Sequence, residues 1–328
     1  MTVRDSNGEI TLGPVLFNWK PKMWRDFYFR IADEAPIGTV YIGEAICSKR
    51  APFLEPYFGK AADRLKMGGK TIVFSTLAEV IRKHDRKLVE SICALGEALV
   101  EANDASALWH LARRAHHIGP FLNVYNEDAL AVVARKGAVN VCLPVEMPKD
   151  AIGALGTAAA GWNVSVEVQV FGRMPLALSA RCYHARAHGR TKDSCQYVCE
   201  NDPDGLELTT LEGKPFLAIN GIQTLSHDYL NLIGALPELR QSGVSRFRLS
   251  PHSCDMVAVA KVFRDVLDRR IGADEALGRL DGLNLPAPFS DGFFHHKPGC
   301  SWTPARSGCD RLAAARGGHA IPGRQSRV

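Results

Sequence analysis

The chain has 328 residues, of which 46% are hydrophobic and 23% charged, so it is long and apolar enough to bury a substantial core, and a disordered or fibrous protein is excluded. The formal net charge is +5, but residues 291–328 hold six Lys or Arg and two acids, a balance of +4, which leaves +1 for the 290 residues before them. A body this close to neutral lacks the positive excess with which nucleic-acid enzymes neutralise phosphates, so we expect no nucleic-acid partner.

The chain shows no sign of a membrane span or a secretion signal. The uncharged stretch at residues 151–166 contains three glycines and is shorter than the roughly 20 apolar residues that a transmembrane helix requires. The first ten residues are polar and lack the apolar core of a signal peptide. We therefore expect a cytoplasmic protein without a transmembrane segment. Nine cysteines, an odd number, then argue against a disulfide framework and favour reduced thiols or metal ligands.

Short apolar runs rich in β-branched residues recur along the chain, and each is followed by a segment with helical spacing, as in βαβ units. Two clear helical stripes are those of residues 78–95 and 256–267. Eight or so such units over about 250 residues predict an α/β fold, a (β/α) TIM-like barrel of regular or irregular closure, over residues 11–290. In chain order, the expected strands are residues 14–18, 39–44, 71–75, 98–101, 121–125, 139–145, 164–171, 216–220 and 245–249.

Two segments depart from this rhythm. Residues 179–210 are polar, charged and rich in Cys, His and Asp, and we interpret them as an inserted loop, because loops of this length are usually functional. After residue 291 the chain is rich in Gly, Arg and Ser and has almost no periodicity. Residues 291–328 are therefore expected to form a basic, flexible carboxyl-terminal tail.

The inserted loop carries three cysteines, Cys182, Cys195 and Cys199, at the spacing C-x12-C-x3-C. Free cysteines are normally buried and dispersed, so three close together need a reason. Coincidental core cysteines are the alternative, but the neighbouring Arg, His, Lys and Asp residues are not those of a core. Adjacent cations would instead lower the thiol pKa and favour thiolate ligands. The sequence thus predicts a metal-binding loop.

A four-coordinate site needs one more ligand, and Cys47 is the best candidate. It comes directly after a predicted strand, where the carboxyl-terminal rim of a barrel would hold functional groups. Cys93 lies on a helical stripe and Cys142 within a strand, so we interpret both as core residues. The remaining cysteines, which have no clustered partners, are Cys254, Cys300 and Cys309.

The spacing favours an iron–sulfur cluster over zinc without excluding zinc. Structural zinc sites tend to use CxxC knuckles, which are absent here, whereas thiolates drawn from separate segments suit a 4Fe-4S cluster. The CxxxCxxC motif of radical enzymes is missing, since Asp202 stands where its last cysteine would be, and HExxH, GxSxG and GxGxxG are absent as well. His116 and His117 are interpreted as structural residues that close a helix before Gly119.

Several short motifs together resemble the UbiV family, the ubiquinone-biosynthesis branch of the collagenase-like (U-type) peptidase superfamily. The resemblance covers about residues 11–299, and the tail beyond departs from the family pattern. The motifs that carry it are GPVL (13–16), YIGEA (41–45), CSKR (47–50), STL (75–77), LPVE (143–146), SARCY (179–183) with the cysteines up to 199, NGIQT (220–224) and RLSP (248–251).

The resemblance implies that Cys47, Cys182, Cys195 and Cys199 are the ligands of a 4Fe-4S cluster. It implies a heterodimer with a UbiU-like paralogue and cooperation with a UbiT-like lipid-binding accessory protein. Its implied role is that of an iron–sulfur subunit required for hydroxylation of ubiquinone precursors without molecular oxygen. It also implies that this branch does not act as a peptidase.

Two alternatives from the same superfamily stay open, an RNA-base hydroxylation factor and a collagenase-like peptidase. The near-neutral body counts against the first, and the missing nucleophile and zinc signatures count against the second. Glu44, Arg50, Arg181 and Arg186 flank the cysteines and either tune a cluster or form ordinary salt bridges. From the sequence we identify no catalytic residue and no oxygen donor, and we assign the substrate pocket to neither this chain nor its partner.

Overall fold

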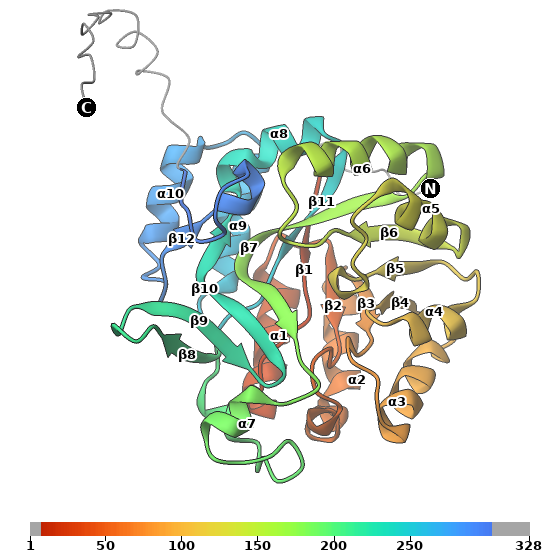
Figure 1. Ribbon diagram of the computed structural model, residues 1–328. Coiled ribbons are helices and arrows are strands. Elements are labelled where there is room, and N and C mark those ends of the chain that lie inside the picture. Colours follow the sequence, from red (N-terminus) through yellow and green to blue (C-terminus); the bar gives the residue numbers. More distant parts are fainter. Residues whose placement is uncertain (1–7, 304–328) are drawn as a thin grey trace, which may run out of the picture.

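The computed structural model describes residues 8–303 (Figure 1). Within them, eight parallel strands close into a barrel, because β11 pairs with both β1 and β7. The predicted (β/α) TIM-like barrel is therefore confirmed. The barrel strands, in their order around it, are β1 (Glu9–Leu12), β2 (Thr39–Ile42), β3 (Thr71–Ser75), β4 (Leu99–Ala102), β5 (His116–Ile118), β6 (Ala138–Cys142), β7 (Ser165–Leu178) and β11 (Val244–Leu249).

Helices surround the barrel, and several begin at a residue whose side chain caps the first turn. Asp104 accepts a hydrogen bond from Ser106 N, and Asp255 accepts from Val257 N and Ala258 N. The helices outside the insertion are α1 (Pro21–Glu34), α2 (Ala51–Met67), α3 (Lys83–Cys93), α4 (Ala105–Leu111), α5 (Glu127–Arg135), α6 (Lys149–Trp162), α8 (Leu236–Gln241), α9 (Met256–Leu267) and α10 (Ala273–Asp281).

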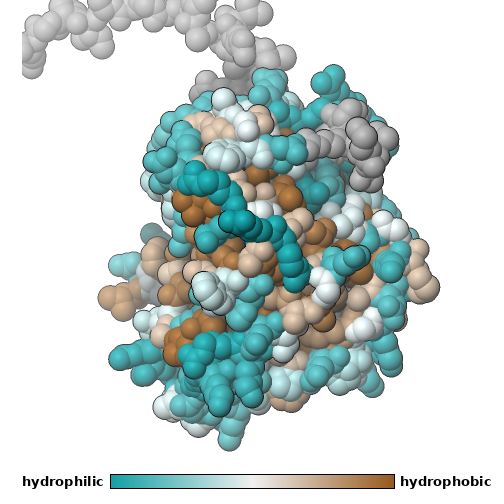
Figure 2. Space-filling view, turned by 90° about the vertical axis from the view of Figure 1, so that its right-hand side faces the viewer, coloured by the Kyte–Doolittle hydropathy of each residue, from teal (hydrophilic) through white to brown (hydrophobic). Residues whose placement is uncertain are grey.

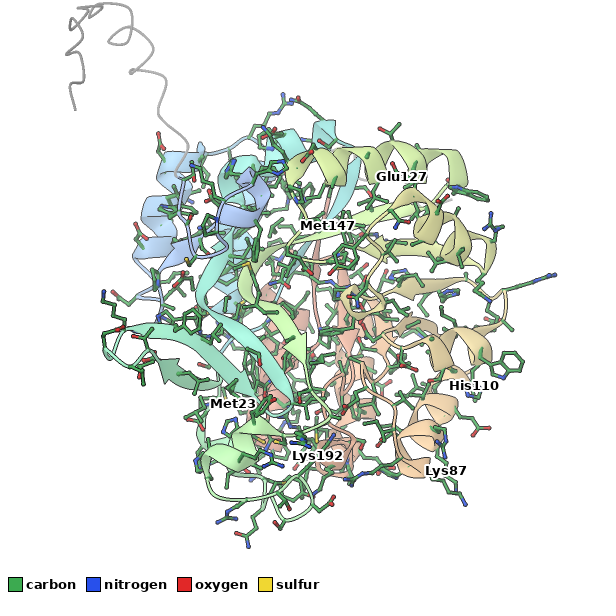
Figure 3. The ribbon with its side chains drawn as sticks, viewed as in Figure 1. Met23, Lys87, His110, Glu127, Met147 and Lys192 are labelled. Carbon is green, nitrogen blue, oxygen red and sulfur yellow. The ribbon has the colours of Figure 1, made fainter. Side chains whose placement is uncertain are left out.

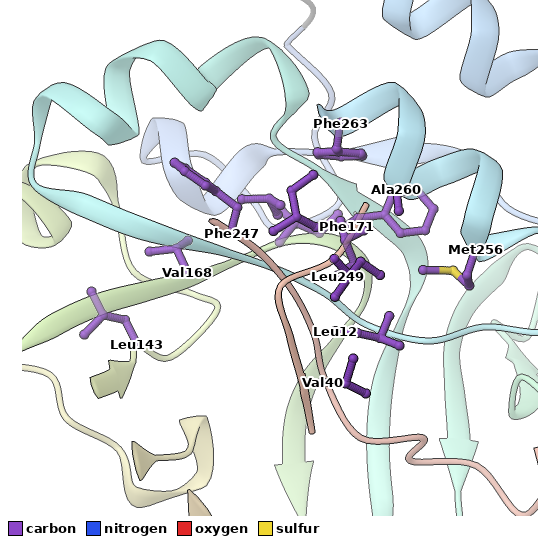
Figure 4. Close-up of a cluster of buried hydrophobic side chains, with 14 of the residues drawn as sticks. Leu12, Val40, Leu143, Val168, Phe171, Phe247, Leu249, Met256, Ala260 and Phe263 are labelled. Carbon is purple, nitrogen blue, oxygen red and sulfur yellow. The ribbon is translucent and has the colours of Figure 1, made fainter. Parts of the chain in front are cut away.

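The apolar core lies between the strands and these helices. Figure 4 shows Leu12 and Leu249 from neighbouring strands packing toward Met256, Ala260 and other residues of α9. The α9 residues that face the barrel are spaced three or four apart, so they form one stripe of the helix. The stripe seen in the sequence at residues 256–267 therefore matches α9 in both bounds.

The interior of the barrel, in contrast, is polar. Arg248 donates to Glu101 Oε1 at 2.7 Å and to Glu167 Oε2 at 3.0 Å, and all three side chains are buried. Glu167 also accepts hydrogen bonds from Tyr41 and Asn140, each at 2.7 Å. Burial by itself would raise the pKa of Glu167, but Arg248, together with the charge of Arg246 and the hydroxyl of Thr11, outweighs burial and lowers the pKa to about 2. The strands are thus tied across the barrel axis by a charged network.

An antiparallel sheet extends from the barrel at β7. The second half of this 14-residue strand pairs with β10 (Gln223–Asn231), which pairs with β9 (Pro215–Asn220), and β9 pairs with β8 (Leu206–Thr209). The short helix α7 (Tyr183–Ala187) precedes this sheet and lies at the end of the molecule opposite α8 (Figure 1). The inserted region is therefore longer than residues 179–210 and is partly a sheet.

Three expectations about strands need correction. Residues 14–18 follow the first strand instead of forming it, and residues 216–220 belong to the antiparallel sheet and not to the barrel. Residues 121–125 form the end of a 3₁₀ turn and a loop instead of the fifth strand, which is β5, so His116 and His117 lie in a strand and not at the end of a helix. Burial lowers the pKa of His117 to about 3, and its neutral ring is hydrogen-bonded to Tyr41 Oη at 2.9 Å.

The boundary expected at residue 291 lies too early. The two-residue strand β12 (Phe289–Ser290) pairs with β10, and a 3₁₀ turn at Gly292–His295 buries Phe294. The backbone N–H of Asp291 donates to Ser301 O at 2.9 Å, and its carboxylate accepts from Thr303 N at 2.8 Å. Residues up to 303 are thus packed, and the rest of the expected tail, residues 304–328, lies outside the described residues.

Among the described residues, none of the helices is both long enough and apolar enough to span a membrane. On the face shown in Figure 2, apolar residues form patches that hydrophilic residues interrupt. Such a mixed surface is ordinary, because folded proteins do not have enough polar atoms to cover themselves.

The charged network inside the barrel yields a stability prediction. Replacing Arg248 by Met leaves the carboxylates of Glu101 and Glu167 buried without a cation, so Arg248→Met should lower the free energy of unfolding by about 3–5 kcal/mol. Arg86 is exposed on α3, and Arg86→Met should change the same quantity by less than about 0.5 kcal/mol. Urea denaturation at pH 7 measures both. Equal stability of the two variants would contradict this role of the network.

Candidate functional site

Cys47 is fixed at the carboxyl-terminal rim of the barrel by the turn that follows β2. Buried Glu44 folds back over this turn, and its Oε1 accepts hydrogen bonds from Ile46 N at 2.8 Å and Cys47 N at 2.9 Å. A 3₁₀ turn at Ser48–Arg50 then leads into α2. The backbone around Cys47 is therefore held by one carboxylate whose lone pairs are directed at successive N–H groups.

The other three cysteines come from the inserted region. Cys182 is the residue before α7, and its Sγ accepts a hydrogen bond from Ala185 N at 3.4 Å. Cys199 lies in a 3₁₀ turn at Val198–Asn201, and Cys195 lies in the loop between α7 and that turn. His184 Nε2 is 2.8 Å from Asp202 Oδ2, which ties α7 to the segment after Cys199.

All four predicted residues line one small cavity, at the end of the barrel where Lys192 is labelled in Figure 3. The cavity walls also include Lys49, Arg50 and Ile222. The structure therefore brings together every cysteine that sequence reasoning selected. It keeps the others apart: Cys93 is buried on α3, Cys142 is buried in β6, and Cys254 packs against Met256. Cys300 is exposed, and Cys309 lies outside the described residues.

Arg50 is the central cation of the site, and its side chain is only 2% exposed. Its Nη2 donates to Cys199 Sγ at 3.5 Å and to Asn220 Oδ1 at 3.0 Å, while its Nη1 donates to Leu16 O at 2.9 Å. Its approach depends on Gly221, which has a φ of +63° and at which a Cβ would lie 2.9 Å from Arg50 Nη2. Arg50 thus joins the rim of the barrel to the inserted region.

Ion pairs and hydrogen bonds hold the loop that carries Cys195. Lys49 Nζ donates to Lys192 O at 2.8 Å and to Asp193 O at 3.1 Å, and lies 3.5 Å from Cys195 Sγ. Lys192 Nζ pairs with Glu79 Oε2 at 2.8 Å. Lys49 thus reaches from the rim of the barrel to the loop, and Lys192 reaches from the loop to Glu79.

The pKa values of two thiols differ from the sequence expectation. Burial raises the pKa of Cys47, and the positive charge of Arg50 only partly compensates. Burial also raises the pKa of Cys182, against the backbone N–H of Ala185 and the charge of Arg50. Nearby cations therefore do not lower these two pKa values in the free thiols, because desolvation is the larger effect. Since ligands must be deprotonated, binding of a metal group here would release protons.

The cysteine thiols are ligands that both zinc and iron–sulfur clusters use. Four thiolates around one zinc ion would lie about 3.8 Å from one another, given Zn–S bonds of about 2.3 Å and tetrahedral geometry. In a 4Fe-4S cluster each thiolate binds a different iron, so its ligands stand farther apart. Within residues 8–303, no group of three or more His, Cys, Asp or Glu is arranged to hold a metal ion. The four thiols around one cavity and the buried cation beside them match such an anionic cluster in ligand type and charge.

Sequence reasoning missed some residues of this site and of the barrel. Lys49 and Asn220 were parts of motifs but had no assigned contact. The interior network of Arg248, Glu101 and Glu167 was also missed. Its sequence signal was the presence of charged residues within predicted strands. Of the flanking residues named from sequence, Glu44 and Arg50 are buried at the site, whereas Arg181 and Arg186 are exposed.

Comparison with known proteins identifies the family of the chain. Among solved structures, the chain is similar to a phospho-2-dehydro-3-deoxyheptonate aldolase from Thermotoga maritima, with 9% identity, a TM-score of 0.39, and coverage of 86% of this chain and 71% of that one. A putative fructose-1,6-bisphosphate aldolase from Coccidioides immitis has 8% identity, a TM-score of 0.38, and coverage of 85% and 86%. Neither TM-score is high enough to support an argument about fold or function. Residues 21–304 match the model of peptidase family U32, and because this match covers most of the chain, the protein belongs to that family.

Proposed function

We propose that this chain is the iron–sulfur subunit of a system that hydroxylates ubiquinone precursors without molecular oxygen. The observation that carries the proposal is the convergence of Cys47, Cys182, Cys195 and Cys199 on one cavity at the carboxyl-terminal end of the barrel. Functional sites of such barrels lie at that end. The motifs that resemble the UbiV family support the same reading.

A bound 4Fe-4S cluster would supply one-electron transfer, a means of moving electrons in a hydroxylation that takes its oxygen atom from a donor other than molecular oxygen. The residues of the chain prepare the cavity for it. Buried Arg50 and half-buried Lys49 place positive charge next to Cys199 Sγ and Cys195 Sγ, which offsets the negative charge that four thiolates bring. Ile222 and Ala185 contribute apolar side chains to the wall.

The resemblance also supports partners. We propose that the chain works as a heterodimer with a UbiU-like paralogue, and that a UbiT-like lipid-binding protein delivers the prenylated substrate. A soluble carrier would serve a purpose here, because ubiquinone precursors are apolar and none of the described helices can span a membrane. We assign the oxygen donor to no single subunit of this complex.

A peptidase function is the second reading that the family name suggests, and one local arrangement bears on it. Ser253 Oγ is hydrogen-bonded to Asp204 Oδ2 at 2.5 Å, near His252. The Nε2 of His252 accepts a hydrogen bond from Arg173 N at 3.0 Å, so that nitrogen does not activate the serine hydroxyl as in a hydrolase triad. This group therefore holds the insertion against the segment after β11, and it lacks the serine–histidine hydrogen bond of a hydrolase triad. The near-neutral body argues against the RNA-modifying alternative.

Iron content tests the ligand set. Single replacement of Cys47, Cys182, Cys195 or Cys199 by Ala should remove most of the iron and sulfide of the anaerobically purified protein, because each thiolate would bind a different iron. Cys93→Ala is the matched control, since Cys93 is buried on α3 away from the cavity, and it should retain the iron. The measurements are iron and sulfide assays with an absorption spectrum. Full iron in all four variants would reject the assignment, and zinc in place of iron would favour a structural zinc site.

Arg50 gives a second test, with reduction potential as the readout. Removing its buried positive charge in Arg50→Gln makes an added electron less favourable, so the midpoint potential should fall by tens of millivolts, where about 59 mV is a tenfold change for one electron. Arg50→Lys keeps the charge and should lie closer to the unchanged protein. Redox titration followed by electron paramagnetic resonance measures all three. A potential that is the same in the Gln and Lys variants would show that the charge does not act on the cluster.

Growth conditions test the biological role. Cells that lack this protein should make ubiquinone normally in air, where oxygen-dependent hydroxylases can act, and should accumulate under-hydroxylated prenylphenols without air. Cys182→Ala should reproduce the defect with the chain still folded, because Cys182 is not one of the residues of the main apolar core. Quinone extraction and mass spectrometry measure both conditions. Equal anaerobic ubiquinone in the deletion and parent strains would reject the biosynthetic role.

A further inference from the structure

A second cavity lies at the same end of the barrel as the cysteines. It is formed by the segments that follow β5 and β6 and by the second half of β7, and its volume is about 310 Å³. Nine of its thirteen lining residues have apolar side chains, Phe121, Leu143, Val145 and Leu176 among them, although polar atoms make up the larger part of the exposed lining surface. This volume is within the range of small-molecule sites, which is about 300–1,000 Å³.

The outer edge of this cavity is open and amphipathic. Leu176 is 40% exposed and Tyr125 is 45% exposed, so both can contact a ligand that extends toward solvent. Tyr125 Oη donates a hydrogen bond to Glu146 across the segments that follow β5 and β6. Burial and the neighbouring carboxylate of Glu146 raise the pKa of Tyr125 to about 12, so its hydroxyl remains protonated at neutral pH.

The inner edge is polar and reaches toward the barrel axis. A smaller adjoining cavity shares Phe121, Gln169 and Pro175 with the first and is also lined by Glu101 and Arg248. Gln169 and Arg248 are both less than 10% exposed. The combined space thus has buried hydrogen-bonding groups at its inner end and apolar side chains along its length.

One layer of side chains separates this space from the cysteines. Leu16, Ala45, Ile46 and Ile222 form a small buried cluster, and Phe121, Leu178 and Cys182 pack against it. Phe121 and Leu178 line the second cavity, whereas Cys182 and Ile222 line the cavity of the four cysteines. The two cavities therefore share a wall.

From this arrangement we infer that the cavity between β5, β6 and β7 binds the substrate, a phenolic ring with a prenyl chain. The ring lies between the apolar walls, its hydroxyl points inward toward Gln169 and Arg248, and the chain leaves past Leu176 and Tyr125. The inference rests on the proposed function for the class of ligand and on the shared wall for the position. It assigns the substrate pocket to this chain and not to its partner.

Binding of 2-prenylphenol to the full chain, prepared without air, tests the inference by ligand-observed NMR titration. Leu176→Arg places a charge in the apolar wall and should weaken binding roughly tenfold or more. Leu211→Arg is the matched control, because Leu211 is fully exposed in the turn between β8 and β9 and is remote from the lining, and it should leave binding unchanged within about twofold. Prenylbenzene, which lacks the hydroxyl, should bind roughly fivefold more weakly than prenylphenol.

Three outcomes would overturn the site: no binding by the unchanged protein, equal binding by Leu176→Arg, or equal loss in Leu176→Arg and Leu211→Arg. Circular dichroism and iron content verify that the variants are folded. If Leu176→Arg fails to fold, the neutral variant Leu176→Gln takes its place and should weaken binding in the same direction.

The iron assay separates failure of this inference from failure of the proposed function. Cys195 lies in the loop and not in the shared wall, so Cys195→Ala should lose iron and still bind prenylphenol. Iron loading together with unaltered binding by Leu176→Arg would reject the pocket and leave the iron–sulfur role standing. Selective prenylphenol binding by a protein that contains no iron would support the pocket and reject the iron–sulfur role.

Discussion

The architecture depends on β7, a strand that pairs in parallel with β6 and β11 in its first half and antiparallel with β10 in its second. The change occurs at Gly172, whose φ is +104° and at which a Cβ would lie 2.8 Å from both Ser250 Cβ and His252 Nε2. Only a residue without a side chain lets the strand pass the end of β11 this closely. Because β7 continues past the rim, it closes the barrel, forms a wall of the second cavity, and delivers Cys182 to the rim that holds Cys47.

Two buried arginines hold the barrel strands and the inserted region in place. Arg248 holds two carboxylates inside the barrel, and Arg50 holds the rim against the inserted region through Asn220 Oδ1 and Leu16 O. A buried charge is costly unless it is paired and hydrogen-bonded, so each arginine specifies the position of its partners more than it adds net stability. The cysteine cavity therefore has the same kind of support as the barrel interior, a cation that only the correct arrangement satisfies.

Much of the barrel could be predicted from sequence because its outer layers follow simple periodicity. Strands β2, β3 and β4 and helix α9 lie close to their expected bounds, and the four clustered cysteines were recognisable by spacing and position. Strand β5 was not predictable, since it has three residues and two of them are histidines. The partners of Arg248 come from strands about 80 and 150 residues away in the chain, so only the closed barrel reveals them. Desolvation of Cys47 and Cys182 likewise follows from packing and not from composition.

The two halves of the cysteine cavity differ in how firmly they are held. Arg50 and Glu44 are buried beside Cys47 and Cys199, and Cys182 packs against an apolar cluster. The loop around Cys195, in contrast, depends partly on the pair of Arg82 with Asp193, whose side chains are 49% and 76% exposed, and exposed ion pairs contribute little. Displacement of this loop therefore costs least. The wall that the cysteine cavity shares with the second cavity is built on the buried cluster of Leu16, Ala45, Ile46 and Ile222, so the firmly held side of the cysteine cavity is the side that faces the second cavity.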